Sequence, residues 1–246
     1  MNQYTDPITI LIPSWKRRKF LPLIIANLKQ QNYPHHLLTV IIDDDGIETD
    51  DDILIRDNEL EEIKRHLEPI KLQYNKSKDR KTIGAKRNQL IKQCKTKIFA
   101  FIDSDDIYFP TYLTHSIDVM KRRKVGCVGS DKMIFTMTDR NFDVHAIDCG
   151  DNELMIHEAS IVATKKWYKA TAGFANSSAG EGVNLFTGMS KKSIGITDIS
   201  QIMCCVQHGE NTIDKLRFAE EKNKLEIRLD ENMIKLLNVI LNYDGQ

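Results

Sequence analysis

Apolar and polar positions in the first half of the chain follow the patterns of buried strands and helices in turn. Two continuous apolar runs, at residues 8–12 and 37–42, have the length of buried strands. Apolar residues at helical spacing fill residues 20–32 between them. The pattern continues with strands at 70–74 and 99–102, and with helices at 59–67, from Gly84 onwards and from Pro110 to residue 124. These strand–helix–strand repeats predict an α/β fold with right-handed crossovers.

The second half, after Val125, has a different texture. Short strand-like pieces alternate with polar loops, at residues 125–128, 133–137, 144–147, 157–163 and 202–206. We expect a loop at 174–181, a helix at 184–191, and two amphipathic helices between 213 and 242, broken near Leu229. Because no linker rich in Gly, Pro or Ser marks a boundary, we predict one domain. It covers residues 1–212, with halves 1–125 and 126–212, and a helical extension at 213–246 offers a possible homodimer contact.

Composition narrows the class of protein. The chain is 41% hydrophobic and 28% charged, which is typical of globular proteins. Its 35 basic and 35 acidic residues cancel to a formal net charge of +0, which argues against a nucleic acid or an anionic membrane as partner. The N-terminus lacks the charged and apolar pattern of a signal peptide, and no apolar run approaches ~18 residues. We therefore expect a soluble, cytoplasmic protein without a transmembrane anchor.

An acidic turn directly follows the apolar run 99–102. Asp103, Asp105 and Asp106 lie within four residues of one another, separated only by Ser104. Ligands of open α/β sheets bind outside the carboxyl ends of the strands, where this turn lies. Two carboxylates at spacing i, i+2 lie on the same side of an extended chain and can hold a divalent cation that also binds phosphate. The simpler alternative is an acidic turn that merely ends the strand.

A second acidic cluster and a basic helix converge on the same edge of the predicted sheet. Asp43–Asp45 end the strand at 37–42, and Lys86 and Arg87 lie in the first turns of the helix that Gly84 opens. Carboxylates bind a metal and ribose hydroxyls, whereas basic side chains and a helix N-terminus bind phosphate. This combination fits a nucleoside diphosphate with a divalent ion. The sequence lacks the glycine patterns of a Rossmann dinucleotide site and of a Walker loop.

Four segments in order resemble a known family. The segments ITILIPSWKRRKFLPLIIANLKQQNYP, LLTVIIDDDG, TIGAKRNQLI and FAFIDSDDIYFP are similar to the nucleotide-sugar half of GT-A-fold glycosyltransferases, and most similar to the large inverting family 2. The resemblance covers residues 1–125. It implies a Rossmann-like α/β GT-A fold, in which helices flank a mixed central sheet.

The resemblance implies a nucleotide site in the first half. Pro13 and the residues just after it would line the nucleotide pocket. Asp44, aligned through the Asp-Gly pair and preferred over its two neighbours, would bind the base, with Asp45 beside it in the site. Lys86 and Arg87 would lie along the nucleotide, unless one of them points to solvent.

The resemblance also implies a cation site at the acidic turn. Asp103-Ser104-Asp105 is similar to the D-x-D motif of the family: Asp103 would meet the ribose, with Ser104 in the same site. Asp105 would bind Mn²⁺ or Mg²⁺ that bridges the two phosphates. Asp106 would support these residues or cap a helix. His208 resembles the late metal- or diphosphate-binding histidine of many such enzymes, with a structural histidine as the alternative.

The catalytic base is expected in the second half of the chain. Residues 179–182 (AGEG) resemble the Gly-Glu-Asp context of the family base, with Gly182 where the Asp often stands. We therefore predict Glu181 as the base, with an ordinary helix-start acid as the alternative interpretation. Glu158 and Asp151 are rival bases, or contact the acceptor instead.

These expectations combine into a function. The resemblance implies a metal-dependent transferase that moves a sugar from a nucleotide-diphosphate sugar to an acceptor hydroxyl with inversion. UDP-sugars are the more common donors and GDP-sugars the alternative, and the acceptor would be a glycan, a protein or a small molecule. One rival is a nucleotidyltransferase, which usually carries a glycine-rich loop where this chain has residues 13–17. The other is a sugar-nucleotide-binding protein without transfer activity, an alternative that Gly182 leaves open.

Overall fold

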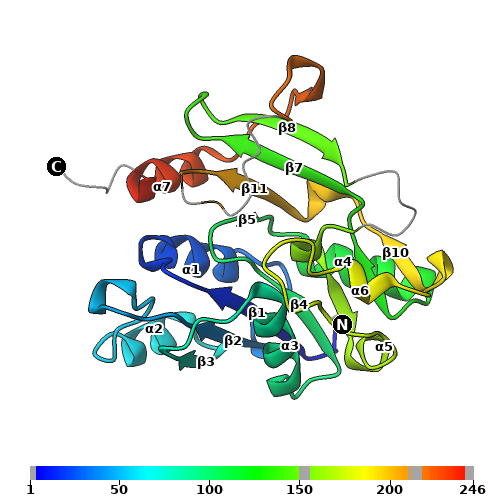
Figure 1. Ribbon diagram of the computed structural model, residues 1–246. Helices are drawn as coiled ribbons and strands as arrows, with labels where there is room; N and C mark the ends of the chain where they lie inside the picture. Colours follow the sequence, from blue (N-terminus) through cyan, green and yellow to red (C-terminus); the bar gives the residue numbers. More distant parts are fainter. Residues whose placement is uncertain (1–3, 150–155, 210, 212–217, 242–246) are drawn as a thin grey trace.

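Seven strands form the larger of two β-sheets, in the spatial order β10-β6-β9-β4-β1-β2-β3 (Figure 1). This computed structural model describes residues 4–149, 156–209, 211 and 218–241. The strands of the larger sheet are β1 (Ile8–Ser14), β2 (Leu38–Asp44), β3 (Lys71–Lys76), β4 (Ile98–Phe101), β6 (Cys127–Gly129), β9 (Val162–Thr164) and β10 (Ile194–Ile196). β4, β1, β2 and β3 run parallel, whereas β9 is antiparallel to both β4 and β6. The mixed sheet confirms the predicted fold class.

Both faces of the central strands are buried. On β1, Ile10 and Ile12 belong to one hydrophobic core and Leu11 to the other. On β4, Ala100 and Phe101 divide between the same two cores. Successive side chains of a strand point to opposite faces, so a strand that is covered on both sides needs apolar residues at every position. This requirement explains the continuous apolar runs in the sequence.

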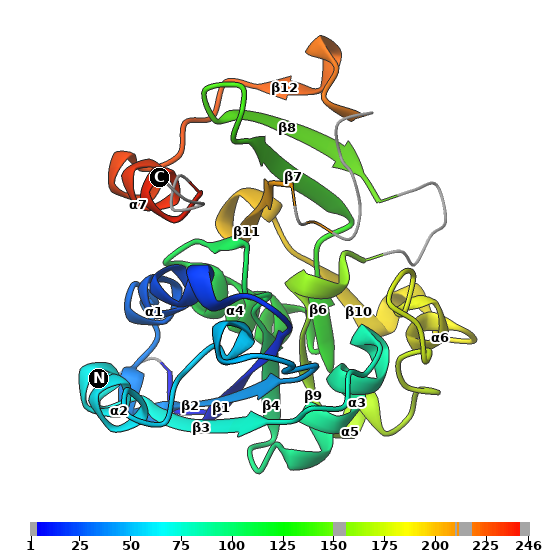
Figure 2. The ribbon, with the colours of Figure 1, turned by 60° about the vertical axis from the view of Figure 1, so that its left-hand side comes forward.

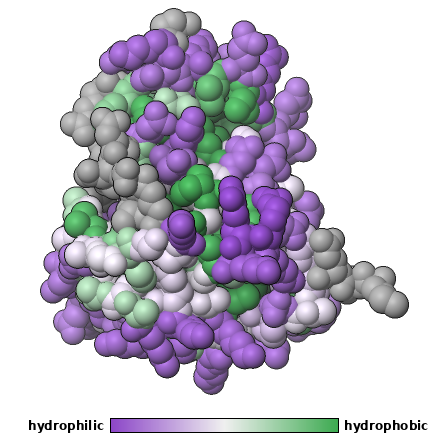
Figure 3. All heavy atoms as spheres, turned by 90° about the vertical axis from the view of Figure 1, so that its right-hand side faces the viewer, coloured by the Kyte–Doolittle hydropathy of each residue, from purple (hydrophilic) through white to green (hydrophobic). Residues whose placement is uncertain are grey.

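Helices cover the two faces of the larger sheet. Apolar residues of α1 (Leu21–Lys29), α2 (Leu60–Leu67) and α4 (Tyr112–Arg123) belong to one core, and those of α3 (Ile83–Gln93), α5 (Lys165–Tyr168) and α6 (Val183–Phe186) belong to the other. Figure 2 shows α1 and α3 on opposite sides of the sheet. On the face shown in Figure 3, hydrophilic side chains cover most of the surface and smaller hydrophobic patches lie between them.

A smaller sheet lies above the larger one in Figures 1 and 2. Its order is β12-β8-β7-β11-β5, formed by β5 (Ile107–Tyr108), β7 (Lys132–Met137), β8 (Asp143–Asp148), β11 (Met203–Gln207) and β12 (Lys224–Leu225). β5 follows the acidic turn and pairs antiparallel with β11. Asp106 strengthens this link, because its Oδ1 accepts a hydrogen bond from Val206 N at 2.9 Å. The acidic turn therefore joins the two sheets, and Asp106 binds β11 and is not the cap of α4, whose N-cap is Thr111.

The C-terminal segment differs from the predicted pair of helices. Within the described part of this segment, a short 3₁₀ turn and β12 precede a single helix, α7 (Glu231–Leu241). β12 pairs with the edge of β8, and α7 packs against α1. Helix propensity is a weak prior that tertiary contacts override, and the open edge of β8 supplies such a contact. The prediction of two helices was wrong for residues 218–225, whereas residues 213–217 lie outside the described residues.

Two further expectations need correction. The predicted helix at 184–191 is the shorter α6, and the sequence reading missed β10, which pairs with β6. The predicted strand at 157–163 divides into a 3₁₀ turn, Glu158–Ser160, followed by β9.

None of the helices among the described residues has the length and apolar character that crossing a bilayer requires. The domain boundary at residue 212 and the homodimer contact remain predictions.

Candidate active site

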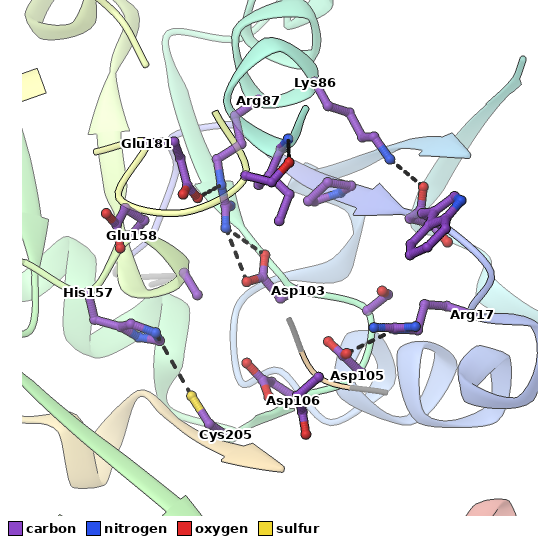
Figure 4. Close-up of a pocket in the computed structure, with 18 of the residues that line it drawn as sticks. Arg17, Lys86, Arg87, Asp103, Asp105, Asp106, His157, Glu158, Glu181 and Cys205 are labelled. Atoms are coloured by element: carbon purple, nitrogen blue, oxygen red, sulfur yellow. Dashed lines mark hydrogen bonds and ion pairs between the residues drawn. The ribbon is translucent and has the colours of Figure 1, made fainter. Parts of the chain in front are cut away.

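A pocket opens between the carboxyl ends of β1 and β4 and the inner strands of the smaller sheet (Figure 4). Pro13 and most of the polar lining come from the larger sheet and its loops. The polar residues are Ser14, Trp15, Arg17, Arg80, Lys81, Lys86, Arg87, Asp103, Ser104, Asp105 and Asp106. The opposite side is lined by Met133, Ile147, His157, Glu158, Cys205 and Phe218, together with Gly180 and Glu181 from the loop before α6. The pocket thus has one strongly charged wall and one wall that is partly apolar.

Asp105 contacts two cationic or polar side chains at the pocket. Its Oδ2 lies 2.9 Å from Arg17 Nε and 3.2 Å from His208 Nε2. Burial disfavours the charged carboxylate, but the hydrogen bonds and charges of His208 and Arg17 outweigh it and lower the pKa of Asp105 to about 2. The side chain is therefore an anion at neutral pH.

Arg87 joins the acidic turn to the loop before α6. Its Nη2 donates to both carboxylate oxygens of Asp103, at 3.0 and 3.1 Å, and its Nε donates to Oε1 of Glu181 at 3.3 Å. Burial alone would lower the pKa of Arg87, but the neighbouring charges of Asp103 and Glu181 raise it. The guanidinium also lies over the ring of Phe101, 4.6 Å from its centroid. This buried cation holds two carboxylates from distant parts of the chain side by side.

The loop that carries Glu181 is bound to the start of α3. Gly84 N donates to Ser177 O at 3.0 Å, and a Cβ atom on Gly84 would lie only 1.8 Å from Ala175 O. Only glycine permits this approach. Ala175 N in turn donates to Glu181 O at 2.8 Å, which closes the loop. The sequence Gly-Ala-Lys-Arg therefore places Glu181 beside Arg87.

The same loop occupies the amide groups at the N-terminus of α3. Ile83 N donates to Ser178 Oγ at 3.3 Å, Gly84 N to Ser177 O, and Ala85 N to the N-cap side chain of Thr82 at 3.2 Å. The first amides of a helix bind an anion only while they are unpartnered. The expectation that this helix terminus binds phosphate was wrong for this arrangement.

Trp15 and Arg80 form a flat surface at the edge of the pocket. The guanidinium carbon of Arg80 lies 3.4 Å from the centroid of the Trp15 ring. Arg80 is exposed and Trp15 is half-buried. A guanidinium stacked on an indole offers both a planar surface and a positive charge to a ligand.

The acidic cluster at the end of β2 is buried. Asp44 has no exposed surface and accepts hydrogen bonds from Leu54 N at 2.9 Å and from Tyr74 Oη at 2.6 Å. Asp45 forms a buried ion pair with Lys86 and accepts from Lys81 N at 2.9 Å. Asp44 and Asp45 are not among the pocket-lining residues, so the structure does not bring them to the ligand surface. Their predicted contact with a nucleotide remains a prediction.

Comparison with known families decides the family. The sequence matches glycosyl transferase family 2 over residues 9–194. The chain belongs to this family. A search of curated proteins by sequence finds no match.

Solved structures share the fold of this family 2 chain. Mannosyltransferase PcManGT from Pyrobaculum calidifontis, in complex with GDP-Man and Mn²⁺, matches 83% of this chain at 14% identity and a TM-score of 0.59. The chain spans 57% of that protein. TarS 1–349 from S. aureus in complex with UDP matches 96% of this chain at 14% identity and a TM-score of 0.60, and the chain spans 72% of that structure. These similarities show that the fold is of the GT-A type.

The family 2 fold implies a divalent cation near the pocket. Among the described residues, no group of three or more His, Cys, Asp and Glu side chains is arranged to hold a metal. Asp105 and His208 do approach each other to 3.2 Å at the pocket. Mn²⁺ and Mg²⁺ sites of phosphate-handling enzymes commonly use one or two protein ligands and complete their shell with phosphate oxygens and water. The Asp105–His208 pair fits such a site.

The structure separates the predicted site residues into three groups. Seven of them line the pocket: Pro13, Lys86, Arg87, Asp103, Ser104, Asp105 and Glu181. His208 joins the site through Asp105, whereas Asp44 and Asp45 lie behind it. Of the rival bases, Glu158 lines the pocket and Asp151 lies outside the described residues.

Arg17 and Arg80 also line the pocket, although neither was predicted individually from the sequence. Arg17 follows β1 in the basic stretch Lys16–Lys19, and Arg80 ends the polar basic loop 75–80. Both stretches contain several basic residues, so the basic character was visible in the sequence. The individual residue that faces the pocket depends on loop conformation, which spacing alone does not encode.

Proposed function

We propose that this chain transfers a glycosyl group from a nucleotide-diphosphate sugar to an acceptor hydroxyl, with inversion at the anomeric carbon. The observation that carries the proposal is the meeting in one pocket of a stacking surface, an acidic turn and a carboxylate pair. These are Trp15 with Arg80, Asp103 with Asp105, and Glu158 with Glu181. Binding of GDP-Man by PcManGT and of UDP-GlcNAc by TarS supports a donor of this class.

The charged wall suits the nucleoside diphosphate. The Trp15–Arg80 surface would stack against the base, since aromatic and guanidinium planes both accept a nucleobase. Nη1 of Arg87 is buried without a hydrogen-bond partner among the described residues. Buried N–H groups normally form hydrogen bonds, so we expect Nη1 of Arg87 to bind an anionic group of the sugar nucleotide. UDP-sugars are the first donors to test and GDP-sugars the second.

Asp105 and His208 would hold Mn²⁺ or Mg²⁺ in this proposal. When bound, the cation would neutralise the charge that develops on the diphosphate leaving group. Arg17 donates to the same oxygen of Asp105, so the carboxylate already has one positively charged neighbour. The protein thereby gathers cationic groups on the side of the pocket from which the leaving group departs.

The transfer step is a single displacement. The acceptor oxygen forms a bond to the anomeric carbon while the bond from that carbon to the diphosphate oxygen breaks, and its electron pair leaves with the diphosphate. The acceptor proton passes to a carboxylate of the pocket, either Glu181, as the sequence favours, or Glu158. General-base assistance of this kind is typically worth ~10²–10⁴-fold in rate. The acceptor would be a glycan, a protein or a small molecule that carries a free hydroxyl.

The direct test is a donor screen. UDP-GlcNAc, other UDP-sugars and GDP-Man are incubated with the protein and Mn²⁺, and release of the nucleoside diphosphate is measured. We expect slow hydrolysis of one donor, accelerated by its acceptor. Micromolar binding of a donor without release or transfer would favour a sugar-nucleotide-binding protein, and absence of both binding and release would refute the proposal.

A further inference from the structure

Two carboxylates meet at one end of the pocket. Glu181 comes from the loop before α6 and Glu158 from the 3₁₀ turn before β9, and both line the pocket (Figure 4). They differ in environment. Glu181 is 7% exposed and its carboxylate is paired with Arg87, whereas Glu158 is only partly buried.

Glu158 occupies the space in front of position 182. A Cβ atom on Gly182 would lie 2.5 Å from Oε1 of Glu158 and 2.6 Å from its Cγ. Oε1 also accepts a hydrogen bond from Gly182 N at 3.2 Å. The backbone of Gly182, at φ −76° and ψ −13°, is ordinary helical geometry that any residue adopts. A side chain at position 182 would therefore have to displace the Glu158 carboxylate, which lies in the space that this side chain would take.

The carboxylate of Glu181 is already occupied as a counterion of Arg87. An ion pair with a guanidinium fixes the orientation of a carboxylate and occupies one of its acceptor positions. Arg87 is 3% exposed and also binds Asp103, so its contact with Glu181 belongs to a buried network. Moving Glu181 out of this pair would take one of the two counterions from a buried cation, which is costly. Glu158 has a different environment, in which burial and the charge of Glu181 raise the pKa of its carboxyl.

We infer that Glu158 is the general base of the transfer reaction and that Glu181 is a positioning residue for Arg87 and Asp103. This assignment rests on the proposed function. In the step, the O–H bond of the acceptor, or of water during hydrolysis, breaks and its proton binds a carboxylate oxygen of Glu158. The oxygen bonds to the anomeric carbon, and the diphosphate leaves with the electron pair of the broken bond. The carboxylate reaches the pocket from the turn before β9 and takes the place of a side chain at position 182.

The two glutamates can be compared by isosteric substitution. Glu158→Gln keeps the acceptor for Gly182 N but removes the basic carboxylate. We expect donor hydrolysis to fall ~10²–10⁴-fold while the donor dissociation constant, measured by calorimetry, changes less than about threefold. Glu181→Gln should instead lower the melting temperature and weaken donor binding, because Arg87 loses a counterion. Glu61→Gln, on the exposed surface of α2, is the matched control.

A transplanted carboxylate gives a second, independent readout. Glu158→Ala empties the space in front of position 182, and Gly182→Asp in that background places a carboxylate there from the other side. We expect the double variant to recover hydrolysis at least tenfold over Glu158→Ala, with circular dichroism confirming the fold of each protein. Gly182→Ala alone should displace Glu158 and slow hydrolysis without loss of donor binding.

Several results would overturn the assignment. Glu158→Gln with a rate within threefold of wild type, or a double variant no faster than Glu158→Ala, would refute Glu158 as the base. Loss of turnover with unchanged donor affinity and stability in Glu181→Gln would return the role to Glu181. A wild-type protein that neither binds nor hydrolyses any sugar nucleotide would refute the proposed function itself, which separates the two failures.

Discussion

Asp103 and Glu181 accept hydrogen bonds from the same guanidinium, that of Arg87, although they come from different halves of the chain. Asp103 lies in the acidic turn two residues after the end of β4, and Glu181 lies in a loop that is hydrogen-bonded to α3. The expected nucleotide contact of Arg87 is therefore only part of its role. Its two counterions make the site sensitive to the loss of this one charge.

Removing the charge of Arg87 should destabilise the fold. Arg87→Met keeps much of the apolar stem but leaves the partly exposed Asp103 and the buried Glu181 without their shared counterion. Breaking a buried ion pair from one side typically costs about 3–5 kcal/mol, and we expect a loss of that size in the free energy of unfolding. Urea denaturation at pH 7 measures it. Arg56→Met is the control, because that guanidinium pairs with Asp51 at the surface and should change stability by less than about 1 kcal/mol. A similar, small effect in both variants would contradict the role of Arg87.

Substitution of Asp44 distinguishes a structural role of this carboxylate from a contact with the nucleobase. Asp44→Ala leaves Leu54 N and Tyr74 Oη without their acceptor, and an unsatisfied buried donor costs about 1–3 kcal/mol each. We expect a clear loss of unfolding free energy. Thermal unfolding and donor calorimetry on the same samples measure stability and affinity. Asp51→Ala, an exposed carboxylate, serves as control. Unchanged stability with strongly weakened donor binding would instead support the predicted contact between Asp44 and the base.

The stacking role of Trp15 can be read from fluorescence. The chain contains 2 tryptophans, Trp15 at the pocket and Trp167 in the core, where it is 8% exposed. Addition of UDP or GDP should quench Trp15 emission in wild type and in Trp167→Phe, but not in Trp15→Phe. Trp15→Ala should weaken nucleotide binding by about 1–3 kcal/mol, the usual cost of a lost base stack. Quenching that persists in Trp15→Phe would exclude this surface as the base site.

We expect the activity to depend on a divalent cation that Asp105 binds. Chelation with EDTA should abolish nucleotide release by wild type, and added Mn²⁺ should restore it. Asp105→Ala should lower release by on the order of 10²–10³-fold at any Mn²⁺ concentration, the usual effect of losing one electrostatic stabiliser in an active site. Glu61→Gln, on α2, controls for handling. Near-normal, metal-dependent turnover in Asp105→Ala would contradict the assignment of the cation site.

The pH dependence of turnover should report Glu158. Burial and the charge of Glu181 raise the pKa of Glu158, whereas the positive charge of Arg87 lowers it. The charge of Glu158 in turn raises the pKa of Cys149, so this thiol is a further titratable group near Glu158. A base works only when deprotonated, so turnover should fall as pH decreases through this raised pKa. The acid limb of kcat/KM, which reports the free enzyme, should therefore lie at a higher pH than the pKa of an ordinary glutamate, which is about 4.3. In Glu158→Ala/Gly182→Asp the limb should move. An acid limb at an ordinary glutamate pKa in wild type would contradict the prediction.

Local patterns predicted the elements that are buried on both sides or sharply ended. The apolar runs of β1, β2 and β4 were visible because strands covered on both faces need apolar residues throughout. Gly84 marked the start of α3 in the sequence. The structure needs a glycine there because Ala175 O approaches the backbone closely, and not because a phosphate does. The last segment was read wrongly for residues 218–225, since two residues of β12 pair with β8 whatever their own propensity.

The sequence by itself determined the α/β order, the acidic turn at the end of β4 and the family resemblance, because these depend on residues close together in the chain. Only the tertiary structure decided which carboxylates line the pocket. In the folded chain, Asp44 accepts a hydrogen bond from Tyr74, and Arg87 lies between Asp103 and Glu181. Glu158 occupies the space in front of Gly182. Such relationships join residues far apart in the chain, and their geometry follows from packing that no local pattern encodes. The acidic turn was readable in the sequence, whereas the base assigned opposite it depends on the fold.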